Sequence, residues 1–193
     1  MTMAYDGMNE VSDDALMVLY ANGDPQAARM LTVRHASRVL NLARRMLKDE
    51  AEAEDVTQEA MLRLWKNASD WRQGEAKVST WLYKVASNLC LDRLRKKRGT
   101  DLDDIPEPED DTPGVEAQIM ATERAESLRD AMAALPERQR LAVSLRHIEG
   151  LSNPEIAEAM SLSVEAVESL TARAKRSLKA LLADKKDELG LVR

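Results

Sequence analysis

The clearest pattern in the chain is a pair of short helices over residues 151–178. Ser152 and Glu155 have the spacing of a capping box at the start of the first helix, and Pro154 falls in its first turn, where the missing N–H costs nothing. The apolar positions of this helix are Ile156, Ala157 and Met160. The pattern therefore predicts a short amphipathic helix that ends just before residue 161.

Ser163 can cap a second helix, and that helix has two unlike faces. Its apolar face consists of Val167, Leu170, Ala174, Leu178 and Leu181. Its polar face consists of Glu165, Glu168, Ser169, Ala172, Arg173 and Arg176. A short apolar helix followed by a helix with a polar outer face is typical of a helix-turn-helix, whose second helix enters the major groove of DNA. The alternative is an ordinary helical hairpin with a solvated charged face.

Helical periodicity and capping residues extend over most of the remaining sequence. The predicted helices begin near Ser12 (ending near Asn22) and then cover residues 25–48, 51–66, 80–98, 115–135 and 137–149, and Ser79 is the expected cap of the fourth. Residues 68–78 break the periodicity and are predicted to form a loop. The expected fold class is all-α.

The predicted helix over residues 51–66 has a mixed surface. Its core stripe is Ala53, Val56, Ala60 and Leu64. The other side is acidic and also carries Leu62 and Trp65, two large apolar residues that the stripe does not explain. Exposed apolar groups among acids indicate a docking site for a partner. A solvated acidic face, with Trp65 packed into the domain, is the alternative.

The segment 99–116 separates two helical halves. Between Thr100 and Glu116 there are eight acids, three prolines and no cation. Such a segment cannot build a core, so we expect a flexible acidic linker between a first domain, 1–98, and a second, 117–193.

Composition and charge narrow the function. Phe is absent, which favours helices packed by aliphatic side chains over a β-rich fold. The net charge is −6, so we expect weak binding to DNA by the chain alone; either its basic patches are local or a partner supplies the electrostatics. Cys90, the single cysteine, lies in an apolar helical pattern and is interpreted as a core residue; His35 and His147 have no metal-ligand spacing around them. No catalytic residue, metal or cofactor is expected. Without a membrane-length apolar run, we expect no membrane insertion and a cytoplasmic location.

Two motifs of the first half and two of the second resemble one family. Ala53–Trp65 (Ala-Glu-Asp-Val-Thr-Gln-Glu-Ala-Met-Leu-Arg-Leu-Trp) and Ser79–Asn88 (Ser-Thr-Trp-Leu-Tyr-Lys-Val-Ala-Ser-Asn) resemble region 2 of bacterial sigma factors. Leu135–Arg140 (Leu-Pro-Glu-Arg-Gln-Arg) and the stretch 151–178 resemble region 4. With only these two domains and an acidic linker, the chain is similar to the extracytoplasmic-function (ECF) subfamily.

The resemblance implies a promoter-specificity subunit of RNA polymerase and assigns roles to residues. The expected contacts with the polymerase beta-prime coiled coil are Asp55, Gln58, Glu59, Met61, Leu62 and Trp65. The expected contacts with the minus-ten DNA are Trp71, Arg72, Lys84, Asn88, Arg93, Arg95, Lys96 and Lys97. The polar face of the second helix, Glu165 to Arg176, is expected to read the minus-thirty-five element. The polymerase beta flap and an anti-sigma factor are further implied partners.

For Trp71, the alternative to a contact with the minus-ten DNA is local packing of the loop.

Three single positions depart from the family pattern. Glu168 stands where relatives often have a cation, and can accept from a cytosine amine. Leu170 replaces another frequent Arg but points inward, and Ser161 occupies a turn position that often has Gly.

Two other classes of function are alternatives. An autonomous helix-turn-helix regulator would bind duplex DNA tightly without the polymerase, and the acidic linker and aromatic loop argue against it. A protein-binding adaptor or anti-regulator would use its acidic surface to mimic nucleic acid and would not need Arg173 or Arg176.

Overall fold

The computed structural model describes residues 11–100 and 116–188, and in this part of the chain every regular element is a helix. The first group is α2 (Asp13–Ala21), α3 (Pro25–Leu47), α4 (Glu50–Lys66), a short 3-10 helix η1 (Ala68–Asp70) and α5 (Val78–Thr100). The second group is α6 (Glu116–Ala134), α7 (Glu137–Val143), a π-helical turn η2 (Ser144–Ile148), α8 (Asn153–Met160) and α9 (Val164–Glu188). The all-α prediction is confirmed. The predicted linker lies almost entirely outside the described residues.

Side-chain caps account for most of the helix starts. Ser12 accepts from the backbone N–H of Ala15 at the start of α2, and Asp24 caps α3 ahead of Pro25. Asp49 caps α4 in the same way. The predicted boundaries are therefore correct to within one or two residues. Two details were wrong: α5 already begins at Val78, so Ser79 does not precede it, and the helix predicted over 137–149 changes to a π-turn after Val143.

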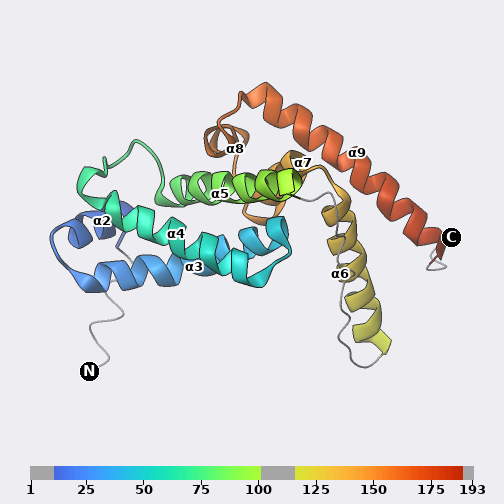
Figure 1. Ribbon diagram of the computed structural model, residues 1–193, viewed down its shortest axis with the longest axis horizontal. Helices are drawn as coiled ribbons and strands as arrows, with labels where there is room; N and C mark the ends of the chain where they lie inside the picture. Colours follow the sequence, from blue (N-terminus) through green and yellow to red (C-terminus); the bar gives the residue numbers. More distant parts are fainter. Residues whose placement is uncertain (1–10, 101–115, 189–193) are drawn as a thin grey trace.

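The main core is formed by α2, α3, α4 and α5, and it continues into the second group of helices. The largest fully buried side chains of the first group include Leu16, Leu31, Leu42, Leu64 and Leu82. The same apolar cluster contains Leu141, Leu145, Ile156 and Val167. Helix α5 therefore lies between the α3–α4 layer and α8, as Figure 1 shows. A smaller cluster, with Leu135, Val143 and Ala174 buried, joins α6, α7 and α9.

Polar contacts reinforce the packing of the two groups. The carboxylate of Glu149 is only 6% exposed; it pairs with Arg45 and accepts a hydrogen bond from the Tyr83 hydroxyl at 2.5 Å. Burial raises the pKa of Tyr83, and the bond to Glu149 adds to this. Lys77 donates to Glu155 at 2.7 Å. These contacts were not predicted, because their partners lie 66 or more positions apart in sequence.

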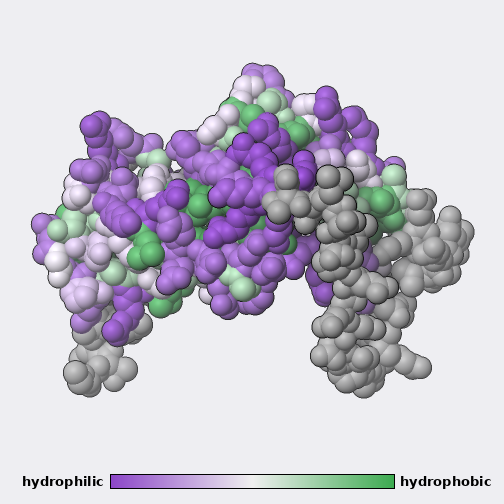
Figure 2. Space-filling model, viewed as in Figure 1, coloured by the Kyte–Doolittle hydropathy of each residue, from purple (hydrophilic) through white to green (hydrophobic). Residues whose placement is uncertain are grey.

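The outer surface is mainly polar, as expected where the apolar side chains are packed inside. Figure 2 shows a face that is mostly hydrophilic, with small and separate apolar patches. Among the described residues, no helix is both long enough and apolar enough to cross a membrane.

Candidate nucleic-acid interface

Helices α8 and α9 form the predicted helix-turn-helix. The capping box is complete: Ser152 accepts from the backbone of Glu155, and the Glu155 carboxylate accepts from the Ser152 backbone N–H at 2.8 Å. Ser163 accepts from the backbone N–H of Ala166 at 3.2 Å and so caps α9. Ser161 ends α8 with φ 52°, in the left-handed region, which is the backbone strain expected where Gly is absent.

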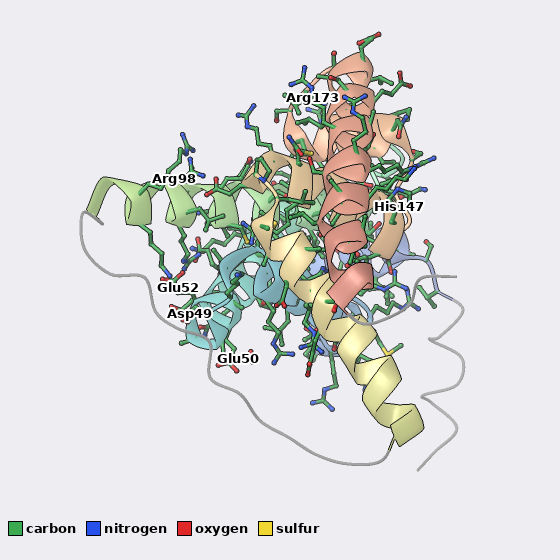
Figure 3. The ribbon with its side chains drawn as sticks, turned by 90° about the vertical axis from the view of Figure 1, so that its right-hand side faces the viewer. Asp49, Glu50, Glu52, Arg98, His147 and Arg173 are labelled. Carbon is green, nitrogen blue, oxygen red and sulfur yellow. The ribbon has the colours of Figure 1, made fainter. Side chains whose placement is uncertain are left out.

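The two faces of α9 are separated as the sequence predicts. Val167 and Ala174 are fully buried, and Leu170 and Leu178 are half-buried. The six residues predicted to read DNA are all exposed: Glu165, Glu168, Ser169, Ala172, Arg173 and Arg176. Arg173, labelled in Figure 3, projects from α9 and is exposed. The amide of Asn153, on α8, donates to Glu168 at 3.3 Å and was not foreseen as its partner.

The loop 71–77 and helix α5 carry the other predicted DNA contacts. Arg72 and Asn88 are exposed, and Lys84 is half-buried. Trp71 is half-buried: its indole N–H donates to Asp14 at 2.9 Å, and its ring lies edge-on to Trp81 with centroids 6.2 Å apart. The structure thus gives Trp71 the local packing that was the alternative role for it, while part of its surface stays open.

The cations at the end of α5 face neighbouring acids. Arg95 pairs with Asp92 one turn earlier, and Lys97 lies 3.1 Å from a carboxylate oxygen of Glu52. Figure 3 shows the acidic start of α4, with Glu52 labelled, below this part of α5. The predicted phosphate-binding group is therefore partly neutralised from within the chain.

A groove between α4 and α5 holds most of the predicted docking residues. Its volume is about 540 Å³, and both charge signs and two leucines line it. The lining residues are Asp55, Gln58, Glu59, Leu62, Arg63, Leu89, Asp92, Arg93 and Lys96. Leu62 is 45% exposed. A surface of this composition can bind an apolar side chain flanked by both charge signs.

Two predicted docking residues lie outside this groove lining. Met61 is buried in the core, at 7% exposure. Trp65 is half-buried and packs on Tyr20, with ring centroids 5.0 Å apart. For Trp65 this is the packed position considered as the alternative. Met61 was named through the family resemblance; on the helix it lies beside the core stripe, whereas Leu62 lies on the opposite, exposed side.

Cys90 lies in the core, fully buried among apolar side chains. Burial raises the pKa of the Cys90 thiol to about 12, so this cysteine is a core residue rather than a nucleophile. The described residues contain no group of His, Cys, Asp and Glu side chains that could hold a metal ion.

Comparisons with known proteins agree with this geometry. Residues 31–100 match the family Sigma-70 region 2, and residues 125–178 match Sigma-70, region 4. The chain is thus similar, in both halves, to bacterial initiation factors of RNA polymerase. The chain is 32% identical over 183 residues to the ECF RNA polymerase sigma factor SigM of Mycobacterium tuberculosis (strain ATCC 25618 / H37Rv). The alignment covers 93% of this chain and 89% of SigM. It is 33% identical over 183 residues to the RNA polymerase sigma-H factor of Pseudomonas aeruginosa (strain PAO1), covering 89% and 94% of the two chains.

A solved structure is also similar. CnrH, in complex with the cytosolic domain of CnrY, superposes with a TM-score of 0.67 at 26% identity, covering 89% of this chain and 97% of CnrH. The chain belongs to the sigma-70 family, as an RNA polymerase sigma factor of the ECF type. It directs promoter-specific initiation of transcription. The family membership confirms the prediction of a promoter-specificity subunit of RNA polymerase, rather than an autonomous regulator or an adaptor.

Proposed function

We propose that the two halves divide the work of initiation between three surfaces. Region 2, within residues 1–98, binds core polymerase and the minus-ten element. Region 4, within 117–193, reads the minus-thirty-five element, and residues 99–116 link the two. The observation that carries this proposal is the exposure of all six predicted reading residues on the one face of α9 that the core leaves open.

The groove between α4 and α5 is the proposed polymerase site. Asp55, Gln58 and Glu59 present acids and an amide on one wall, while Leu62 and Leu89 supply apolar contact. Binding energy at protein interfaces concentrates in such apolar anchors surrounded by polar groups. The proposed partner is the beta-prime coiled coil, bound through an apolar side chain flanked by charges of both signs. Trp65 and Met61 act from behind it, by fixing α4 on the core.

The minus-ten strand is proposed to lie along loop 71–77 and α5. Arg72 points into solvent, with its side chain 77% exposed, and Asn88 is exposed on α5. Trp71 offers the open part of its ring for stacking with an unpaired base. The upstream backbone would lie over Lys84, Arg93, Arg95, Lys96 and Lys97.

Readout of the minus-thirty-five element is proposed for α9. Arg173 and Arg176 supply guanidinium groups for guanine or phosphate, and Glu168 accepts from a cytosine amine. The bond from Asn153 holds Glu168 at the start of the reading face. The acid therefore favours a different base from the one that a cation at this position would select.

The remaining assignments follow from this role. We propose that the chain is not an enzyme, acts in the cytoplasm beside core polymerase, and touches the beta flap through region 4. An anti-sigma factor is the proposed inhibitor. In support, CnrH, similar to this chain along most of its length, is held in a complex with the cytosolic domain of CnrY.

Run-off transcription with purified core polymerase over a genomic DNA library tests the function. The chain is expected to start transcription at a defined set of promoters that share two elements. Leu62→Ala should lower affinity for core polymerase about tenfold, as for an interface anchor. Val33→Ala is the matched control: it shortens a 64% exposed side chain on α3 and should leave the affinity for core polymerase unchanged. Absence of any specific transcript from the wild type, with active core polymerase, would overturn the proposal.

A further inference from the structure

Asp14 joins the start of the chain to the loop proposed to capture the minus-ten strand. It lies in the first turn of α2. One carboxylate oxygen accepts from the Trp71 indole N–H at 2.9 Å, and the other accepts from the Gly74 backbone N–H at 3.2 Å. Both partners lie 57 or more positions away in sequence. The side chain therefore bridges two fixed points of the loop.

Asp14 is not needed for the helix to which it belongs. Ser12 already caps α2. Its neighbour Asp13 faces α3 instead, with Arg34 and His35 each 2.7 Å from its carboxylate oxygens. Two adjacent acids thus have separate tasks: Asp13 fixes α2 to the bundle, and Asp14 faces the loop.

The two hydrogen bonds bracket the residues that point outward. Trp71 is half-buried against Trp81, and Gly74 has φ 80°, a conformation that glycine adopts without strain. Between these points Arg72 and Gln73 are exposed. Because the segment is fixed at Trp71 and at Gly74, the side chains between these two residues are held in one orientation. This lowers the entropic cost of ordering them when DNA binds.

We propose that Asp14 is a positioning residue for strand capture. It holds Trp71 and Gly74 so that the open part of the indole ring, Arg72 and Gln73 face the unpaired minus-ten strand before DNA arrives. Asp14 itself does not touch DNA. The inference rests on the proposed function of the loop; it adds Gln73 to the minus-ten surface and Asp14 as the residue that positions this surface.

The test uses holoenzyme reconstituted with Asp14→Asn, Trp71→Phe, the double variant, or Asp13→Asn as the matched control. Affinity for a single-stranded minus-ten oligonucleotide and affinity for core polymerase are measured separately by fluorescence anisotropy. Asp14→Asn should lower strand affinity about tenfold and leave core affinity unchanged. The substitution removes the charged carboxylate that accepts from both the Trp71 indole N–H and the Gly74 backbone N–H. Asp13→Asn should leave strand affinity unchanged.

Coupling between the two sites distinguishes positioning from general destabilisation. If Asp14 acts through Trp71, Asp14→Asn should cost less in the Trp71→Phe background than in the wild type. Equal strand affinity of Asp14→Asn and wild type would overturn the inference, as would a parallel loss of core affinity. Should Asp14→Asn not fold, Trp71→Phe decides: it removes the N–H and keeps a ring, and unchanged strand affinity contradicts the proposal.

The outcome is separable from failure of the function itself. A wild-type holoenzyme that does not bind the oligonucleotide or transcribe contradicts the proposed function. A fully active wild type with an equally active Asp14→Asn variant contradicts only the inference about Asp14.

Discussion

Ser161 and Lys48 adopt positive φ angles of 52° and 55°, the non-glycine residues with this conformation in the described part of the chain. For a residue with a Cβ atom, the left-handed region costs about 1–2 kcal/mol. Ser161 accepts this cost because the turn between α8 and α9 has to be short. The strained position was predictable from the sequence, since it falls where glycine is common in this motif.

Ser161→Gly should stabilise the protein by about 0.5–1 kcal/mol. Relief of the left-handed strain is the gain, and it is reduced by the larger conformational entropy of glycine in the unfolded chain. Urea unfolding followed by circular dichroism measures the change. Ser37→Gly, at an exposed position within α3, is the control and should destabilise by about 0.5 kcal/mol. A destabilised Ser161→Gly would contradict this account of the turn.

Other single residues were beyond the reach of the sequence. Asp14 and Asp13 are adjacent acids with the same pattern, and only the fold shows that one faces the loop and the other α3. Asn153 gave no signal as a partner of Glu168, because a bond between two helices depends on how they cross. Local rules predict what a residue does to its own helix, and not which distant group it meets.

At the scale of the element, the capping box of α8 has a second task. Glu155 caps the helix through Ser152 and also accepts from Lys77 in the loop. The bond from Lys77, followed by those from Ser152, lowers the pKa of Glu155 to about 2 from an ordinary 4.5. A carboxyl group with a lowered pKa stabilises the folded state above its ordinary pKa, and this contribution is lost as the pH falls through the lowered value.

Glu155→Gln should therefore flatten the dependence of stability on pH. The variant is expected to be less stable than wild type at pH 7, and the difference should shrink as the pH falls from about 4.5 toward 2. Urea unfolding at a series of pH values provides the measurement. Glu158→Gln, an exposed position on the same helix, serves as the comparison. A difference that persists unchanged at pH 2 would show that the charge of Glu155 is not responsible.

Helix α9 supports a prediction about readout. Arg173→Ala should weaken holoenzyme binding to a promoter with a matched minus-thirty-five element by about 1–3 kcal/mol, the range for one lost guanidinium–base contact. On a template with that element scrambled, the loss should be much smaller. Lys175→Ala removes a cation two positions further along the helix, outside the proposed reading face, and should have little effect on either template. Equal losses for both variants would point to general electrostatics.

Elements were the best-predicted level of this structure. Several helix starts were predicted from their capping residues, because capping is a local interaction. These residues are Ser12, Asp24 with Pro25, Ser152 and Ser163. The buried and exposed faces of α9 followed from spacing alone. The π-turn at Ser144–Ile148 was missed, since an extra residue in a turn leaves the apolar pattern of its helix almost unchanged. The sequence likewise gave no sign that Arg98 pairs with Glu137 across the two groups of helices.

On the scale of the whole molecule, the proposed DNA-binding surfaces lie close together. Lys77 of the loop contacts Glu155 on α8, and Asn153 on the same helix contacts Glu168 on the reading face of α9. The two promoter elements are about 25 base pairs apart, or about 85 Å along straight B-form DNA. With α5 packed on α8 the two proposed surfaces are held side by side, so we expect these helices to separate before one chain reads both elements.

Weakening the contact around Glu149 should favour separation. Glu149→Ala leaves Arg45 and Tyr83 without their acceptor, and loss of one partner of a buried ion pair costs about 3–5 kcal/mol. The variant is expected to show a larger radius of gyration in small-angle X-ray scattering and a higher affinity for core polymerase, because less of its population is closed. Glu126→Ala, an exposed position on α6, is the control. An unchanged radius of gyration would contradict this role of Glu149.

The apolar core that runs through α5 into α8 also makes the closed arrangement sensitive to cooling. Burial of apolar surface is associated with a large change in heat capacity, and the resulting attraction weakens as the temperature falls. A contact that depends on Leu82, Leu145 and Ile156 should therefore loosen in the cold, while the ion pairs at its edge persist. We therefore expect core polymerase to open the chain more easily at low temperature.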